Sequence, residues 1–111
     1  MSALVPVITA GDDIDLRVKV YDVDGNLLDV SSWTIYARIL DAEGAALTDA
    51  IQQSSGSTGA DWAHGVVRAI FPAAKTANIT AGDAQLELQR TDSGHRTTAA
   101  LIPLIVQVVP A

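Results

Sequence analysis

The chain has 111 residues, which fits a single hydrophobic core, and we expect one domain over residues 1–111. Its lack of cysteine excludes disulfides and thiolate metal sites, and its longest apolar run, Ala99 to Val106, is far shorter than the ~20 residues of a membrane-spanning helix. Seven Lys and Arg against thirteen Asp and Glu give a net charge of −6, which argues against nucleic acid as a partner, because phosphate binding needs clustered basic residues.

The first segment with strand character is Leu4 to Ile8, which is short and rich in β-branched residues. Pro6 has no backbone N–H and cannot sit in a fully paired central strand, so the segment is predicted to be an edge strand. After a turn at residues 9–12, residues 14–21 alternate between apolar and polar types, with one face formed by Ile14, Leu16, Val18 and Val20. Such alternation is typical of a strand with one buried face.

A second alternating stretch follows a strong turn signal. Residues 22–26 read Asp-Val-Asp-Gly-Asn, which supplies the positive φ angles that a chain reversal needs. Beyond it, the apolar face of residues 33–39 is formed by Trp33, Ile35, Ala37 and Ile39. We therefore predict that residues 14–21 and 33–39 pair as an antiparallel hairpin with one solvated face.

The middle of the chain has weaker patterns. Residues 45–51 predict a weak strand, and residues 52–59, which are rich in Ser, Gly and Gln, predict a mobile loop. A strand opened by Trp62 or His64 is predicted to end before Pro72. Behind that proline, residues 73–79 contain helix formers and predict one or two helical turns.

The last third of the chain predicts two strands joined by a turn at residues 92–95. Residues 84–90 alternate, with Leu86 and Leu88 inward and Gln85, Glu87 and Gln89 outward. The final strand, residues 96–109, is apolar on both faces, and Pro103 marks a bulge or an unpaired edge position. Short strands at close spacing without a long helical period predict an all-β sandwich of about seven strands. Its core should contain Leu16, Val18, Val20, Trp33, Ile35, Ile39, Leu86 and Leu88.

No motif carries enzymatic chemistry. Residues 22–26 resemble a calcium loop only superficially, because Gly25 precedes Asn26 and no closing glutamate follows. The Ser-Gly loop lacks the lysine and the following helix of a phosphate-binding loop, and His64 and His95 do not lie in a catalytic pattern. We expect a protein that is not an enzyme and has no cofactor. A minority possibility is an oxygen-rich metal site formed by Asp12, Asp13, Asp15 and Asp83.

The tryptophans are the remaining candidates for ligand contact, because an exposed indole ring can stack on a sugar. Trp33 lies on the apolar face of its strand, which favours core packing. Trp62 lies at a junction between loop and strand, and both interpretations stay open for it.

Three blocks of the sequence resemble a known family. The first is residues 11–26, which include Leu-Arg-Val-Lys-Val-Tyr-Asp and Asp-Gly-Asn. The other two are residues 29–39, Asp-Val-Ser-Ser-Trp-Thr-Ile-Tyr-Ala-Arg-Ile, and residues 82–94, Gly-Asp-Ala-Gln-Leu-Glu-Leu-Gln-Arg-Thr-Asp-Ser-Gly. Together they are similar to the small immunoglobulin-like modules of tailed-bacteriophage virion proteins, and most to the N-terminal module of baseplate upper proteins. The chain departs from that pattern at Gln85 and Leu86, where such modules often carry aromatic residues.

The resemblance implies an immunoglobulin-like antiparallel β-sandwich with one short helical turn. It also implies a non-enzymatic structural or assembly protein of the virion, made in the cytoplasm of the bacterial host, that attaches or decorates tail, baseplate, neck or fibre components. The implied partners are other phage structural proteins or further copies of the chain in a homo-oligomer. The alternative function is a ligand-binding β-sandwich that recognises a host surface glycan.

The terminal segments are the candidate subunit interface. The last strand is apolar on both faces, and one sheet of a sandwich covers only one of them. An uncovered apolar strand edge invites pairing with another chain. The predicted contact residues are Leu4, Val5, Val7, Ile8, Leu101, Ile102, Leu104 and Val106, with Pro6 and Pro103 limiting further growth of the sheet.

Overall fold

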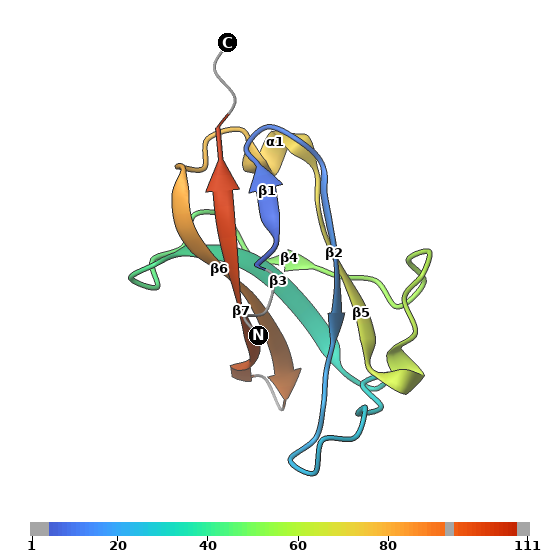
Figure 1. Ribbon diagram of the computed structural model, residues 1–111. Coiled ribbons are helices and arrows are strands. Elements are labelled where there is room, and N and C mark those ends of the chain that lie inside the picture. Colours follow the sequence, from blue (N-terminus) through green and yellow to red (C-terminus); the bar gives the residue numbers. More distant parts are fainter. Residues whose placement is uncertain (1–4, 93–94, 109–111) are drawn as a thin grey trace.

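The computed structural model describes residues 5–92 and 95–108, and these residues form seven strands, one 3₁₀ turn and one helical turn (Figure 1). The strands are β1 (Val7–Thr9), β2 (Ile14–Lys19), β3 (Thr34–Asp41), β4 (Ile51–Gln52), β5 (Val66–Phe71), β6 (Gly82–Asp92) and β7 (His95–Gln107). The 3₁₀ turn is Trp62–His64 and the helical turn, α1, is Ala73–Thr76. The predicted all-β class is confirmed.

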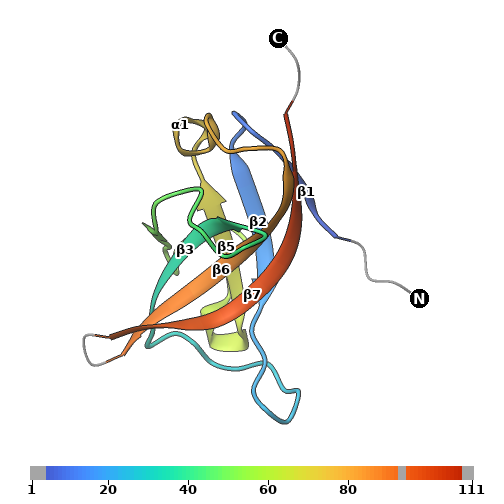
Figure 2. The ribbon, with the colours of Figure 1, turned by 90° about the vertical axis from the view of Figure 1, so that its left-hand side faces the viewer.

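The strands form two layers, which face each other in Figure 2. One sheet has five strands in the order β1-β7-β6-β3-β4, and the other has β2 paired with β5. The predicted hairpin of residues 14–21 with residues 33–39 is therefore wrong, because β2 and β3 belong to different sheets. The turn at residues 22–26 closes only a local bridge between Tyr21 and Leu27, and the chain then crosses the end of the sandwich, where Val30 is wholly buried.

One core fills the space between the sheets. Of the eight predicted core residues, Val18, Val20, Ile35, Ile39, Leu86 and Leu88 are buried, each with at most 6% of its surface exposed. Leu16 and Trp33 pack against this core but stay partly exposed. Ile14, Val67 and Phe71 are also buried in this core, although they are not among the eight predicted residues. On β5 only Arg68 is polar, so its sequence does not single out the buried face.

β1 is the predicted edge strand, but it runs parallel to β7, so the sheet is not wholly antiparallel. A parallel pair needs a long connection, and here the whole domain lies between the two strands. The bulge of β7 falls at Ala99, opposite Leu88 and Gln89, and not at Pro103. Because Ile105 N donates to Pro6 O at 2.9 Å, the nitrogen of Pro103 also points away from β6, and its missing N–H removes no bond of the β6–β7 ladder.

Two other segments differ from the sequence-based expectation. Trp62 begins a 3₁₀ turn and not a strand, and the weak strand at residues 45–51 is reduced to β4 and a bridge between Leu40 and Ala46. The helical turn behind Pro72 is confirmed. Its buried Thr76 accepts the Gly11 amide at 3.2 Å and donates to Asp12 O at 2.7 Å, which fixes the connection between β1 and β2.

Candidate interaction surface

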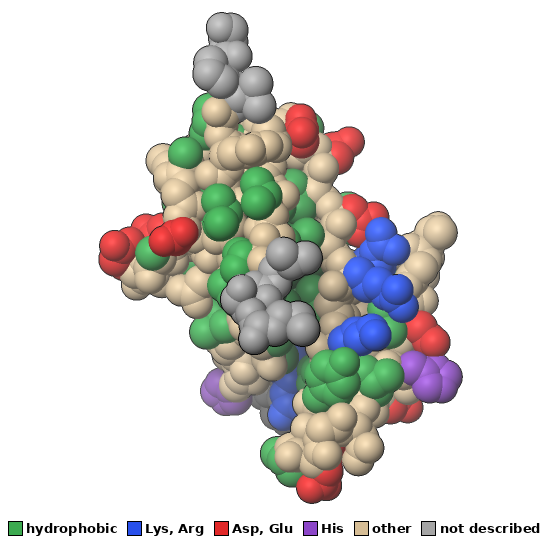
Figure 3. All heavy atoms as spheres, viewed as in Figure 1, with side chains coloured by type: hydrophobic (Ala, Val, Ile, Leu, Met, Phe, Trp, Pro, Cys, Tyr) green, Lys and Arg blue, Asp and Glu red, His purple; other side chains and the backbone are tan. Residues whose placement is uncertain are grey.

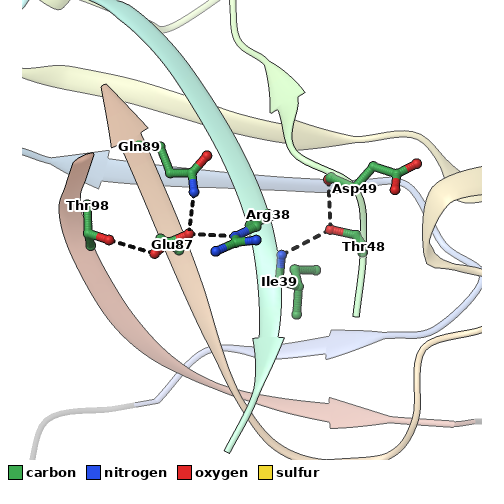
Figure 4. A network of polar contacts seen from close by, with 7 residues as sticks. All are labelled: Arg38, Ile39, Thr48, Asp49, Glu87, Gln89 and Thr98. Carbon is green, nitrogen blue, oxygen red and sulfur yellow. Dashed lines mark hydrogen bonds and ion pairs between the residues drawn. The ribbon is translucent and has the colours of Figure 1, made fainter. Parts of the chain in front are cut away.

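The outer face of the five-stranded sheet has a polar half centred on Glu87 (Figure 4). The Glu87 carboxylate accepts from Arg38 Nε at 2.6 Å, from Thr98 Oγ1 at 2.6 Å and from Gln89 Nε2 at 2.8 Å. These partners come from β3, β7 and β6, so the network crosses three neighbouring strands. The Glu87 carboxylate is thereby occupied by its neighbours, whereas the buried Gln89 Oε1 has no hydrogen-bond partner among the described residues.

The pKa of Glu87 is lowered although its side chain is only 6% exposed. Burial raises the pKa, but the hydrogen bonds from Thr98 and Arg38, the positive charge of Arg38 and the hydrogen bond from Gln89 outweigh it. Glu87 is therefore ionised at neutral pH and holds the three strands together. Glu87 points away from the core, as predicted, but the side chains that bind its carboxylate cover it.

The other half of this face is apolar. We call Val5, Val7, Leu101, Pro103 and Ile105 the apolar patch. They are exposed, Val7 by 55% and Leu101 by 54%. Hydrophobic side chains gather over β1 and β7 in Figure 3. A groove of about 320 Å³ lies within this half, lined by Val5, Pro103 and Ile105 together with Ala42, Asp83 and Gln85. Grouped exposed apolar side chains beside a polar surround are typical of a contact surface.

The chain closes the strand edges on the opposite side of the sandwich. Ile70 N on β5 donates to Gln53 Oε1 at 2.9 Å, so a buried glutamine side chain takes the place of a neighbouring strand. On β3, Ile39 N donates to Thr48 Oγ1 at 3.0 Å (Figure 4). Both devices satisfy backbone groups that would otherwise be free to pair with another chain.

Among residues 5–92 and 95–108, no such device closes the edge beside the apolar patch. β1 pairs with β7 only at residues 105–107, and Pro6 O adds one bond to Ile105. Within the described residues, no strand lies beside residues 95–104 on that side of β7, and β1 itself ends the sheet. The apolar patch therefore lies next to an open strand edge.

The predicted interface residues divide into two groups. Val5, Val7 and Leu101 belong to the apolar patch, and Ile102 is half-buried. Ile8, Leu104 and Val106 instead point into the chain's own core, each with at most 5% of its surface exposed, so their inclusion is corrected here. Leu4 lies outside the described residues. Sequence reasoning did not include Pro103 and Ile105 in the candidate interface, because an apolar run on both faces does not show which residues point outward.

Asp13 and Asp15 among the acidic candidates, and His64 among the histidines, have partners within the fold. Asp13 accepts the Ala73 amide at 2.7 Å, and Asp15 forms a two-pronged pair with Arg68 at 2.6 and 2.7 Å. Within the part of the chain that the structure describes, no three His, Cys, Asp or Glu side chains gather as a metal site. His64 is exposed and pairs with Asp61 at 2.9 Å.

Both tryptophans line an open groove of about 450 Å³ together with Gln52, Ser54 and Ser55. Trp62 is only 6% exposed and belongs to the core, and its indole Nε1 has no hydrogen-bond partner among the residues that the structure describes. The guanidinium of Arg90 lies over the Trp33 ring at 4.7 Å. Burial of Trp62 and coverage of one Trp33 face leave little aromatic surface on which a sugar could stack.

No protein-family model and no curated protein sequence matches the chain. Among solved structures, the chain is similar to the N-terminal domain of phage TP901-1 ORF48. The two align with a TM-score of 0.56 over 94% of this chain and 83% of that chain, at 10% sequence identity. At that identity the likeness shows a shared fold. None of the helical segments in residues 5–92 and 95–108 has the length and apolar character that crossing a bilayer requires.

Proposed function

We propose that this chain is a non-enzymatic structural protein of a tailed-bacteriophage virion, which attaches or decorates a tail, baseplate, neck or fibre component through its subunit contacts. The observation that carries the proposal is the apolar patch beside the open edge of β7 and β1. A surface of this kind needs a protein partner to cover it, and a virion supplies one permanently. The fold shared with a domain of a phage protein supports the same role.

The partners in this proposal are other phage structural proteins or further copies of the chain, and the site of action is the virion assembled in the bacterial host. The alternative, recognition of a host glycan, would use the groove beside Trp33 and Trp62. We favour the structural role, because the apolar patch is exposed whereas Trp62 is almost wholly buried.

A charge placed in the apolar patch tests the proposal. Leu101→Lys should leave the melting temperature of the isolated protein within ~2 °C of that of the unaltered protein, because exposed substitutions change stability little. The same substitution should reduce incorporation of the protein into particles at least tenfold. Ile70→Lys is the matched control, because Ile70 is also an exposed apolar residue, at 37%, on the outer face of the other sheet. Incorporation is measured by immunoblotting of purified particles. Normal incorporation of Leu101→Lys would contradict the proposal, and loss of particle or cell attachment only in Trp33→Ala would favour glycan recognition.

A further inference from the structure

A second open strand edge lies along β2, in the sheet that does not carry the apolar patch. Within the described part of the chain, β2 pairs only with β5. Val20 N donates to Gly65 O at 2.8 Å, and hydrogen-bonded residues alternate along an antiparallel pair. The even-numbered residues of β2 therefore bond to β5, whereas Asp15, Arg17 and Lys19 direct their backbone N–H and C=O groups away from it.

The chain itself does not cover this edge. Ile70 lies opposite Asp15 and donates its N–H to Gln53 and not to β2, which agrees with the alternation. Among the described residues, no hydrogen bond reaches the backbone of Asp15, Arg17 or Lys19 from the open side. The edge can therefore accept a further strand.

The side chains that share the outer face along this edge change sign at its middle. In order they are Asp13, which directly precedes β2, then Asp15, Arg17 and Lys19. Arg17 and Lys19 are exposed, and the described residues contain no ion pair or ring partner for either. Basic side chains gather over β2 and β5 in Figure 3. Asp15 pairs with Arg68, but 46% of the Asp15 side chain stays exposed.

This order of charges matches itself when two copies of β2 pair antiparallel about Leu16. Asp15 then lies opposite Arg17 of the second copy. In the same register, Asp13 lies opposite Lys19 of the second copy. Each pair forms twice, so every directly opposite pair joins unlike charges, whereas like charges at such positions destabilise a sheet. In an in-register parallel pairing, or in an antiparallel pairing shifted by two residues, at least one of these charges lies opposite its own copy.

The backbone and the inward side chains fit the same register. Asp15 and Arg17 both direct N–H and C=O groups outward, so they form hydrogen-bonded pairs across the contact. Leu16, which packs against the core but stays partly exposed, meets its own copy at the two-fold axis. A groove of about 220 Å³, lined by Val7 of β1 and Leu16 of β2 among others, opens at this position. A second copy on the edge covers this apolar lining.

The other charges near the edge do not oppose this match. Asp12 is exposed at the same end as Asp13 and adds to the negative charge that Lys19 of the second copy meets. At the other end, the chain turns away from the strand, and the Asp22 carboxylate accepts the amides of Asp24 and Asn26 at 2.9 and 3.0 Å. Acidic and basic groups therefore meet at both ends of the pairing.

We infer that two copies of this chain pair through β2 in a two-fold dimer, which joins their two-stranded sheets into one sheet of four strands. The contact is isologous, because the same surface of both copies forms it. Backbone hydrogen bonds hold the strands together, and the order of charges selects one register. The inference goes beyond the proposed function and does not depend on it, since the apolar patch lies on the other sheet and stays available to another partner.

A charge reversal and its rescue test the pairing. The unaltered chain should form a dimer of twice 11.6 kDa in sedimentation equilibrium and nothing larger. Lys19→Asp sets like charges opposite each other and should raise the dissociation constant of the dimer at least tenfold. Adding Asp13→Lys in the same chain exchanges the two charges and should restore the dimer. Arg96→Asp is the matched control, because it changes the net charge equally on the other sheet and should dimerise normally.

A cross-link tests the register independently. The chain has no cysteine, so an introduced one gives a unique signal. Residues opposite each other at a site without hydrogen bonds have Cα atoms about 4.5 Å apart, which a disulfide can span. Leu16→Cys should therefore form a covalent dimer under mild oxidation, seen on a non-reducing gel. Ile70→Cys, which is exposed on β5 and lies far from its copy in the dimer, should stay monomeric.

Three results would each overturn the inference: an unaltered chain that is monomeric at all concentrations, normal dimerisation of Lys19→Asp, or cross-linking of Leu16→Cys no faster than that of Ile70→Cys. Leu101→Lys should dimerise normally, because the apolar patch is not part of this contact. If Leu101→Lys is monomeric while Lys19→Asp still dimerises, the apolar patch is the contact between copies. The β2 pairing then fails, and the proposed function stands.

Discussion

Replacing Leu88 by Ala should destabilise the domain strongly, because the assignment of faces on β6 depends on this residue. Leu88 is 1% exposed, and its register partners on β3 and β7 are Ala37 and Ala100. Two alanines cannot move into the space that the missing atoms leave, so the cavity should persist. We expect a loss of about 3–4 kcal/mol in the free energy of unfolding, in the middle of the range for buried Leu→Ala changes. At an unfolding entropy of ~2.1 cal/mol/K per residue, this lowers the melting temperature by about 15 °C.

Leu101→Ala is the matched control for that experiment, since Leu101 is the register partner of Glu87 and points to the opposite face of the sheet with 54% exposure. The same truncation there should cost less than ~0.5 kcal/mol. Urea unfolding of both variants, followed by tryptophan fluorescence at a concentration where the protein is monomeric, gives the two free energies. If Leu88→Ala melts within a degree of the unaltered protein, or if both variants lose the same stability, our assignment of the buried and exposed faces of this sheet is refuted.

Three further predictions concern the backbone and the polar network. Gly65→Ala should cost more than ~2 kcal/mol in thermal unfolding, because φ is +73° and an added Cβ would lie 2.7 Å from Val20 O and 2.8 Å from Leu28 O. Because the pKa of Glu87 is lowered, its ionised form stabilises the fold at neutral pH. This contribution is lost as the pH falls through the folded-state pKa. Glu87→Gln should therefore show a weaker fall in melting temperature between about pH 5 and pH 3. Gln53→Ala should cost about 1–3 kcal/mol and accelerate amide exchange at the strand edge that it covers, measured by hydrogen–deuterium exchange.

The period-2 pattern identified most strands and the buried face of β2, β3 and β6, because each of these strands has one face on the core and one toward solvent. The same pattern did not reveal which strands pair. β2 and β3 would show the same alternation whether they paired as a hairpin or lay in opposite layers. The turn signal at residues 22–26 therefore does not establish that they pair. The decisive feature is the segment after the turn, where Val30 is wholly buried and its amide donates to Trp62 O at 2.8 Å. That contact joins segments far apart in sequence.

The exposed apolar patch was only partly predictable for a related reason. β7 is apolar on both faces, so its sequence does not show which alternate residues point inward. In addition, the bulge at Ala99 reverses the direction of side chains along the strand. Thr98 points outward to Glu87, whereas Ala100, two residues later, points inward as the partner of Leu88. The edge closure by Gln53 was missed because a glutamine before a Ser-Gly stretch indicates a solvated loop, and only the folded chain brings it to Ile70.

The polar half and the apolar patch lie on the same outer face of the five-stranded sheet, and the difference between them supports the proposed contact role of the apolar patch. Thr98 and Leu101 both point outward from β7, and both approach Glu87, yet one is bound into a polar network and the other is more than half exposed. The polar half shows that this face of the sheet tolerates hydroxyl and carboxylate side chains without loss of the strand ladder. A monomer would gain solubility from polar residues at the positions of Leu101 and Ile105 as well. Their apolar character, beside a strand edge for which residues 5–92 and 95–108 provide no closing side chain, supports the proposal that a partner covers them.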